Sequence, residues 1–205
     1  GAQNTVNAGT DTLASIDNLM GGGYGDNLYG DAGDNIINGG YGSGGDTIYG
    51  GAGNDTLEGG TGYGYGNDRL VGGLGNDVLD GGEGQDVADY RGSTEAVTAS
   101  LLAGTATTAT VAGDGNDTLT SIEVLYGSDF DDTLTGDDDI YGGNTLYGGD
   151  GNDILNGGAG YDDLYGGNGN DTINGDDGDD LLVGGAGNDT LNGGAGRDIA
   201  DLQTS

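Results

Sequence analysis

A period of nine residues dominates this sequence. Residues 148–156 read GGDGNDILN, and five further copies of the same template fill residues 157–201 without a gap. Those copies read GGAGYDDLY, GGNGNDTIN, GDDGDDLLV, GGAGNDTLN and GGAGRDIAD. Self-similarity at a short fixed period is typical of repeat proteins, in which each unit packs only on its neighbours. The period therefore predicts a stack of small, similar turns instead of a conventional globular core.

The template occurs fifteen times, as seven copies in residues 21–89 and eight in residues 127–201. The sixth position is Asp in thirteen copies and Asn in two, at Asn35 and Asn144. The eighth position is Leu or Ile in thirteen copies, and Ala88 and Ala200 occupy it where the two blocks end. The copies at 39–49, 59–71 and 136–147 carry insertions in their glycine-rich halves.

A longer repeat overlies the short one and defines the expected domains. Residues 11–19 read DTLASIDNL and residues 117–125 read DTLTSIEVL, and both phrases lead into a repeat block. We therefore expect two tandem units. Residues 1–20 are interpreted as the end of a preceding cap segment, 21–89 as block 1, 90–126 as an intervening cap with short strands, 127–201 as block 2, and 202–205 as the start of a following cap.

The charge of the chain restricts its partners. Thirty-six carboxylates stand against three arginines, the chain has no Lys, and the formal net charge is −33. Such a balance excludes nucleic acid as a partner and leaves either intrinsic disorder or bound cations. No apolar run approaches the roughly 18 residues of a membrane-spanning helix, so we expect no membrane insertion. The regular repeats favour order, and hence bound cations.

The spacing within each copy predicts the fold. Glycines at positions one, two and four favour a tight turn over the first six residues, and the last three residues favour a short strand. Two copies then complete one 18-residue coil, so copies two apart lie in neighbouring coils on the same side. This is an all-β fold, a parallel β-roll (β-helix) of two blocks of stacked nonapeptide turns with a β-rich cap segment between them. The eighth side chain faces inward, and the seventh and ninth face water.

Stacking also aligns the sixth-position carboxylates. We expect one column to contain Asp153, Asp171 and Asp189. Three similar columns are expected, which consist of Asp162, Asp180 and Asp198, of Asp55 and Asp77, and of Asp46, Asp68 and Asp86. The columns would repel each other unless cations lie between the turns. Ca²⁺ accepts six to eight oxygen ligands in tolerant geometry, whereas Mg²⁺ fits less well. His and Cys, the usual zinc and copper ligands, are absent from the chain.

These residues resemble the RTX, or hemolysin-type calcium-binding, repeats, whose consensus is GGxGxDxUx. The phrases TSIEVLYGS at 120–128 and VADYRG at 87–92 are also similar to those of multi-block RTX proteins. The resemblance implies Ca²⁺ between turns, held by sixth-position Asp and by loop carbonyls, with about ten ions in all. The implied ligand residues are Asp26, Asp46, Gly51, Gly53, Asp55, Asp68, Gly73, Gly75, Asp77, Gly82, Gly84, Asp86, Asp132, Gly149, Gly151, Asp153, Gly158, Gly160, Asp162, Gly167, Gly169, Asp171, Gly178, Asp180, Gly185, Gly187, Asp189, Gly194, Gly196 and Asp198.

The resemblance further implies type I secretion, folding on extracellular Ca²⁺, and a location outside the cell or on the bacterial cell surface. We expect a structural, stiffening region of a secreted adhesin or surface-layer-type protein. The alternative is an accessory module of a secreted epimerase, lipase or protease that aids secretion, folding or polysaccharide binding. We expect no catalysis within this chain, since no Asp-rich turn differs from the others. An EF-hand is excluded because no segment has its ligand spacing.

Tyrosines at the ninth position suggest a second binding surface. Tyr147 and Tyr165 are two copies apart, as are Tyr29 and Tyr49, so each pair is expected to stack on one outward face. Such a ladder either binds sugar rings or only stabilises a solvated sheet through cross-strand pairs. The loop tyrosines fit either interpretation; they are Tyr24, Tyr41, Tyr63 and Tyr65. Cell-surface polysaccharide and neighbouring copies of the chain are therefore candidate partners beside calcium.

Overall fold

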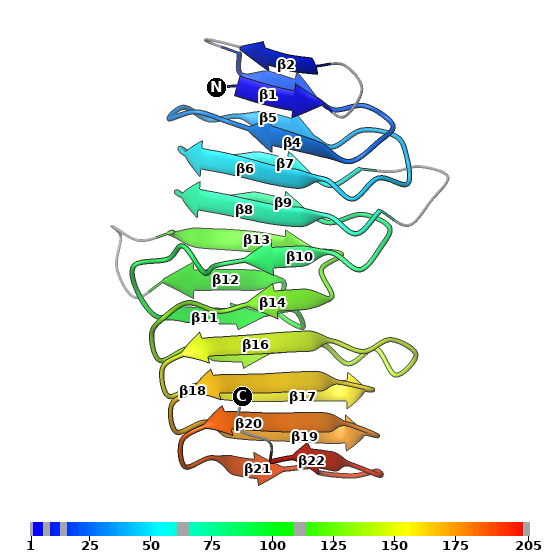
Figure 1. Ribbon diagram of the computed structural model, residues 1–205, viewed down its shortest axis with the longest axis vertical. Coiled ribbons are helices and arrows are strands. Elements are labelled where there is room, and N and C mark those ends of the chain that lie inside the picture. The colour runs from blue at the N-terminus through cyan, green and yellow to red at the C-terminus, as the bar shows by residue number, and fades with distance from the viewer. Residues whose placement is uncertain (1, 6–8, 13–15, 61–65, 109–113, 203–205) are drawn as a thin grey trace. The chain divides into compact units, whose positions relative to one another are not determined.

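The computed structural model describes residues 2–5, 9–12, 16–60, 66–108 and 114–202. These residues form strands and turns, with no helix among them (Figure 1). Accordingly, no helix in this part of the chain is long and apolar enough to cross a membrane. Tyr63, Tyr65 and part of the phrase at 11–19 lie outside the described residues. The predicted all-β class is confirmed.

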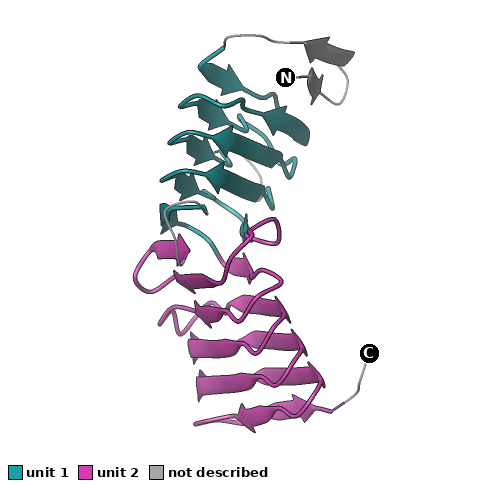
Figure 2. Cartoon of the chain, turned by 90° about the vertical axis from the view of Figure 1, so that its left-hand side faces the viewer, with its two compact units in different colours: residues 1–89, 111–122 teal, residues 90–110, 123–205 magenta. Residues whose placement is uncertain are grey.

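The chain divides into two compact units, residues 1–89 with 111–122 and residues 90–110 with 123–205 (Figure 2). The strands of unit 1 are β1 (Ala2–Thr5), β2 (Gly9–Thr12), β3 (Asn18–Met20), β4 (Asp26–Tyr29), β5 (Ile36–Asn38), β6 (Thr47–Ala52), β7 (Thr56–Glu58), β8 (Arg69–Leu74), β9 (Val78–Asp80), β10 (Val87–Asp89) and β13 (Asn116–Thr120). Those of unit 2 are β11 (Val97–Ser100), β12 (Thr105–Thr108), β14 (Val124–Tyr126), β15 (Thr133–Thr135), β16 (Thr145–Asp150), β17 (Ile154–Gly160), β18 (Asp163–Asn168), β19 (Thr172–Gly178), β20 (Leu181–Ala186), β21 (Thr190–Asn192) and β22 (Ile199–Asp201).

Each unit contains strands of two sheets. In unit 1 the first sheet has the order β2-β1-β4-β6-β8-β10 and the second β13-β9-β7-β5-β3. In unit 2 the first sheet has the order β14-β16-β18-β20-β22 and the second β21-β19-β17-β15-β11-β12. Strands from copies two apart pair in parallel, as in β16, β18 and β20, whereas the β1–β2, β1–β4 and β11–β12 pairs are antiparallel. This parallel stacking confirms the predicted β-roll.

The core of each unit is a double ladder of eighth-position side chains. In the first sheet of unit 2, Leu146 pairs in register with Leu164, which pairs with Leu182, and all three are buried. In the second sheet, Leu155 aligns with Ile173 in the same way. The burial alternates along each strand because successive strand residues point to opposite faces. The predicted inward position is therefore correct.

The end of unit 2 departs from this pattern. Leu191 is only half-buried, and Ala200 is exposed, although both occupy the eighth position. Within the described residues no further coil packs against β21 and β22. An eighth-position side chain is thus buried by the next coil as much as by its own.

Truncation of one ladder side chain should show what the core contributes. We expect Leu155→Ala to lower the free energy of unfolding in CaCl₂ by roughly 2–5 kcal/mol, because it leaves a cavity at a fully buried site. The adjacent Ile154 is 43% exposed on the outer face, so Ile154→Ala serves as the control and should have a much smaller effect. Urea denaturation followed by circular dichroism measures both. Equal losses in the two variants would contradict the inward assignment.

Candidate metal centre

The sixth-position carboxylates form buried columns along each stack. In unit 2 the backbone N–H of Asp153 donates to Oδ1 of Asp171 at 2.9 Å, and that of Asp171 donates to Oδ1 of Asp189 at 3.1 Å. Ten hydrogen bonds of this kind, 2.7–3.2 Å long, join successive Asp residues. The columns are Asp26–Asp46–Asp68–Asp86, Asp55–Asp77–Asp117, Asp132–Asp153–Asp171–Asp189 and Asp162–Asp180–Asp198. Each column aligns the turns that carry it.

The second carboxylate oxygen has no hydrogen-bond partner in several of these columns. Among the described residues, Oδ2 is buried without a hydrogen bond in six Asp residues, which are Asp55, Asp77, Asp153, Asp162, Asp171 and Asp180. A β-carbon added to Gly148 would meet both Oδ2 of Asp153 and the carbonyl oxygen of Gly166 in the next coil. The unpaired carboxylate oxygen and a backbone carbonyl thus converge on one gap between turns.

Burial also changes how these carboxyls titrate. Desolvation raises the pKa of Asp46 and of Asp153 from 3.8 to about 7, and that of Asp77 and of Asp162 to about 6. Backbone N–H donors lower each pKa, but neighbouring carboxylates in the turns raise it further. A group held this way is costly to ionise unless a cation lies against it.

The predicted ligand glycines lie where backbone carbonyls face across the gap. Gly167 and Gly169 have φ of +113° and +145°, and a β-carbon on either would overlap the carbonyl oxygen of Gly149 or Gly151 in the preceding coil. The other predicted glycines face a carbonyl in the same way; they are Gly51, Gly53, Gly73, Gly75, Gly82, Gly84, Gly149, Gly151, Gly158, Gly160, Gly178, Gly185, Gly187, Gly194 and Gly196. Side chains are excluded from these gaps, and oxygen atoms line them.

This donor set fits Ca²⁺. No group of three or more carboxylates gathers among the described residues, so a cation must take much of its coordination from carbonyls. Oxygen-only coordination that mixes carboxylates and carbonyls is what Ca²⁺ accepts at six to eight ligands. The buried, unpaired Oδ2 atoms would supply the charge for such an ion, and the carbonyls of the turns would complete its shell.

Comparison with known families supports the same assignment. The family model for RTX calcium-binding nonapeptide repeats matches residues 11–43, 42–65, 63–90, 120–144, 126–164, 140–173 and 165–200, well over half of the chain. The chain belongs to this family. A comparison with curated proteins gives no match. The chain is thus a calcium-binding RTX β-roll module.

The structure adds one RTX turn that the sequence analysis assigned to the intervening segment. Asp117 is buried, and its Oδ1 accepts from the backbone N–H of Asp77 at 2.9 Å. Gly115, at the fourth position of the same turn, has φ of +89° and faces the carbonyl of Gly75. Residues 115–119 read GNDTL, as do residues 53–57, and this match is the signal that identifies the extra copy.

The first-position glycines are a second structural feature that the predicted set of site residues does not include. Glycine occupies this position in all fifteen copies, whereas Ser128 and Asp176 are among the residues that replace glycine at position two. In Gly157, as in Gly148, an added β-carbon would meet the carboxylate of its own turn, here Asp162. Invariance within the chain was the available signal. In the copies with Asp at position six, a first-position side chain would therefore collide with the carboxylate of its own turn.

Asn35 and Asn144 also have a structural explanation. Asn144 lies in the turn that stacks on Glu123, and the N–H of Thr145 donates to the carbonyl of Glu123. Residues 120–122, which precede Glu123, contain no glycine and so do not form the six-residue turn of the template. Asn35 stacks in the same way on Asp17, through the N–H of Ile36. Both Asn residues therefore lie where the preceding coil has no complete glycine turn.

Asparagine ladders are a further feature that the sequence analysis missed. At the fifth position the N–H of Asn170 donates to Oδ1 of Asn152 at 2.9 Å, and that of Asn188 donates to Oδ1 of Asn170 at 2.9 Å. A second ladder at the ninth position joins Asn174 to Asn156. These side chains accept hydrogen bonds from backbone N–H groups and side-chain amides of the adjacent coil. They therefore help to fix the register of the coils without adding charge.

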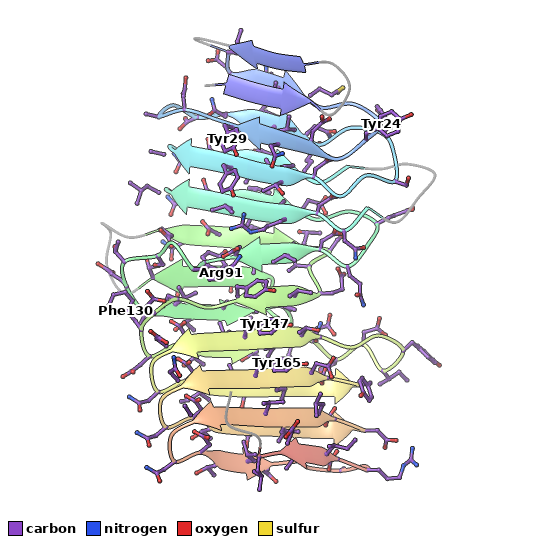
Figure 3. The ribbon with its side chains drawn as sticks, in the orientation of Figure 1. Tyr24, Tyr29, Arg91, Phe130, Tyr147 and Tyr165 are labelled. Atoms are coloured by element: carbon purple, nitrogen blue, oxygen red, sulfur yellow. The ribbon has the colours of Figure 1, made fainter. Side chains whose placement is uncertain are left out.

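The predicted tyrosine pairs stack. The ring centroids of Tyr29 and Tyr49 are 4.9 Å apart, and those of Tyr147 and Tyr165 are 4.8 Å apart. Tyr126 extends the unit 2 ladder, with its ring centroid 4.5 Å from that of Tyr147. Arg91, labelled in Figure 3, lies over the Tyr126 ring. Interplanar angles of 3–9° show that the rings cover each other's faces. This geometry suits cross-strand stabilisation and leaves no ring face between neighbours for a sugar.

Removing one column charge should weaken calcium binding. We expect Asp153→Asn to raise the Ca²⁺ concentration needed for half-maximal folding by roughly 3- to 10-fold, because the site loses a charged ligand. Asp129→Asn makes the same charge change at an exposed residue of the neighbouring turn, and should shift the midpoint by less than about twofold. Circular dichroism during a CaCl₂ titration measures the midpoint. Matching shifts in both variants would show that only net charge matters.

Acid should partly replace calcium. Between pH 4 and about pH 7, the calcium-free folded form binds more protons than the unfolded form, since burial raises the pKa of Asp46 and of Asp153 to about 7. The stability of the calcium-free form is then highest at low pH and falls as pH rises through this window. We expect a larger folded fraction at pH 5 than at pH 8 in calcium-depleted buffer, measured by circular dichroism. The opposite order would contradict these pKa shifts.

Proposed function

We propose that this module is a calcium-switched structural segment of a secreted or surface-exposed protein. Its turns bind about ten Ca²⁺ ions, one in each gap between successive column carboxylates. The ligands are the column Asp side chains, Asp117 included, with the carbonyls of the first, second and fourth turn positions. One observation carries the proposal: among the described residues twelve column Asp side chains are buried, and in six of them the second carboxylate oxygen lacks a hydrogen bond.

This arrangement favours folding outside the cell. Buried, unpaired carboxylates destabilise the calcium-free stack, so metal that binds only the folded state contributes directly to folding free energy. Extracellular calcium modules work at about 10⁻⁴ to 10⁻³ M. The calcium-poor cytosol would then keep the chain unfolded until export, and the high calcium outside would fold it.

The geometry also favours a mechanical role. In each unit the ladder hydrogen bonds and the column bonds run from coil to coil, so calcium links every coil to the next. The tyrosine and asparagine ladders reinforce the same direction. A segment of this kind stiffens when calcium binds, as suits a spacer in an adhesin or a surface-layer-type protein.

Calcium titration and force measurements test the proposal together. We expect a cooperative gain of β signal in circular dichroism between about 10⁻⁴ and 10⁻³ M CaCl₂ at pH 8, with little response to MgCl₂. Magnetic tweezers applied to the chain should then detect discrete unfolding steps in CaCl₂ and none in EGTA. Folding in EGTA, or an equal response to Mg²⁺, would overturn the calcium switch. Calcium-driven folding without any resistance to force would instead overturn the structural role.

A further inference from the structure

The two turn edges of each unit differ in chemistry. Turns that enter the second sheet carry the fifth-position ladder, such as Asn54 and Asn76 in unit 1. Turns that enter the first sheet carry all three insertions, at 39–49, 59–71 and 136–147. They also carry exposed aromatic side chains, whereas within the described residues Phe130 is the one exposed aromatic side chain on the turns of the ladder edge. One edge is thus regular, and the other is variable.

In unit 2 the variable edge presents an aromatic surface. Tyr141 is 93% exposed and Ile140 66% exposed at the tip of the inserted loop, and Tyr161, on the adjoining turn, is 56% exposed. The N–H of Tyr161 donates to the carbonyl of Gly142 at 3.3 Å, which holds the two turns side by side. Unit 1 has a counterpart, where the N–H of Tyr41 donates to Gly22 beside the exposed Tyr24 (Figure 3). Unlike the ladder tyrosines, these rings stack on no neighbouring ring among the described residues.

Carboxylates flank this surface. Asp138 and Asp139 are exposed in the same loop. Asp139 Oδ1 accepts from the N–H of Tyr141 at 3.1 Å, and Asp137 Oδ1 accepts from the N–H of Asp139 at 2.9 Å, so the loop is internally braced. With a formal net charge of −33 on the chain, this edge repels polyanions and attracts cations.

The chain itself shows which cation such a surface accepts. Arg69 donates from Nη1 to the hydroxyl of Tyr49 at 2.6 Å and from Nε to Asp89 at 2.5 Å, with its guanidinium 5.3 Å from the centre of the Tyr49 ring. The guanidinium of Arg91 lies 4.3 Å from the centre of the Tyr126 ring. Two of the three arginines in the chain are therefore held by a tyrosine ring, and Arg69 also uses a carboxylate.

We propose that the surface formed by Ile140, Tyr141 and Tyr161, with Asp138 and Asp139, binds an arginine-containing segment of another protein. The guanidinium stacks on an exposed tyrosine ring and pairs with a loop carboxylate, as Arg69 does within unit 1. Arginine suits this role better than lysine, because its planar group stacks on aromatic rings and donates in a fixed fork. The proposal goes beyond the structural role, since none of these five residues belongs to an Asp column or to a side-chain ladder.

A peptide-binding assay tests this surface. The chain, folded in CaCl₂, is titrated into a fluorescent alternating Gly–Arg octapeptide, and into the matching Gly–Lys peptide, with anisotropy as the readout. We expect Tyr141→Ala/Tyr161→Ala to weaken Gly–Arg binding by about 5- to 30-fold, for the loss of two cation–π contacts. Phe130→Ala removes an exposed ring from the opposite edge of the same unit at equal charge, and should leave binding unchanged.

Circular dichroism in CaCl₂ separates a folding defect from a binding defect. Since Tyr141 is 93% exposed, the single variant Tyr141→Ala keeps the test valid if the double variant fails to fold. Tyr141→Phe retains the ring and should retain most of the binding. The proposal is overturned if the tyrosine variants and Phe130→Ala behave alike, which would indicate diffuse charge attraction. Saturable, tyrosine-dependent binding of neutral maltohexaose would overturn it in favour of a sugar.

Discussion

One constraint underlies both units: each regular turn buries a carboxylate directly above that of the coil before it. Oδ1 of Asp171 accepts a backbone N–H from Asp153, so the charge also sets the register of the preceding coil. Oδ2 of the same residue is buried and unpaired, which leaves the turn short of one positive partner. A single Asp side chain therefore both aligns neighbouring coils and leaves a buried negative charge that a cation could neutralise. Each further coil with Asp at position six adds another buried carboxylate, and under the proposed function this couples folding to metal binding along each unit.

The Leu/Ile, Asn and Tyr ladders each stabilise the stack in a different way. Leu155 and its neighbours supply the buried apolar surface, but the ladder is only one side chain wide in each sheet. Asn152 and Asn170 fix the turns without adding charge to an already acidic chain. Tyr147 and Tyr165 cover the outer face of the first sheet. All of these contacts run between copies two apart, so a defect in one copy affects chiefly the coils beside it.

The sequence predicts most of this because two positions have unambiguous roles. A Leu at position eight and an Asp at position six every nine residues allow one arrangement that buries the first and aligns the second. Asp117 was missed because its turn begins with residues 112–114, which read AGD, so the copy looks like the end of a cap. The contact of Arg69 with Tyr49 and Asp89 spans three coils, and depends on rotamers that no periodicity specifies.

The difference between the two edges follows from what a calcium gap requires. In the fifteen copies that begin with glycine, the gap combines a first-position residue without a β-carbon, carbonyls aimed across the turn, and a side-chain oxygen at position six. In the inserted copy 39–49, Gly39 and Asp46 keep both ends of this arrangement, and the added residues lie between them. Residues can therefore be added toward solvent without disturbing the stack. Tyrosines gathered on that edge, outside every ladder, make it the part of the module where recognition can change while the calcium-binding frame stays constant.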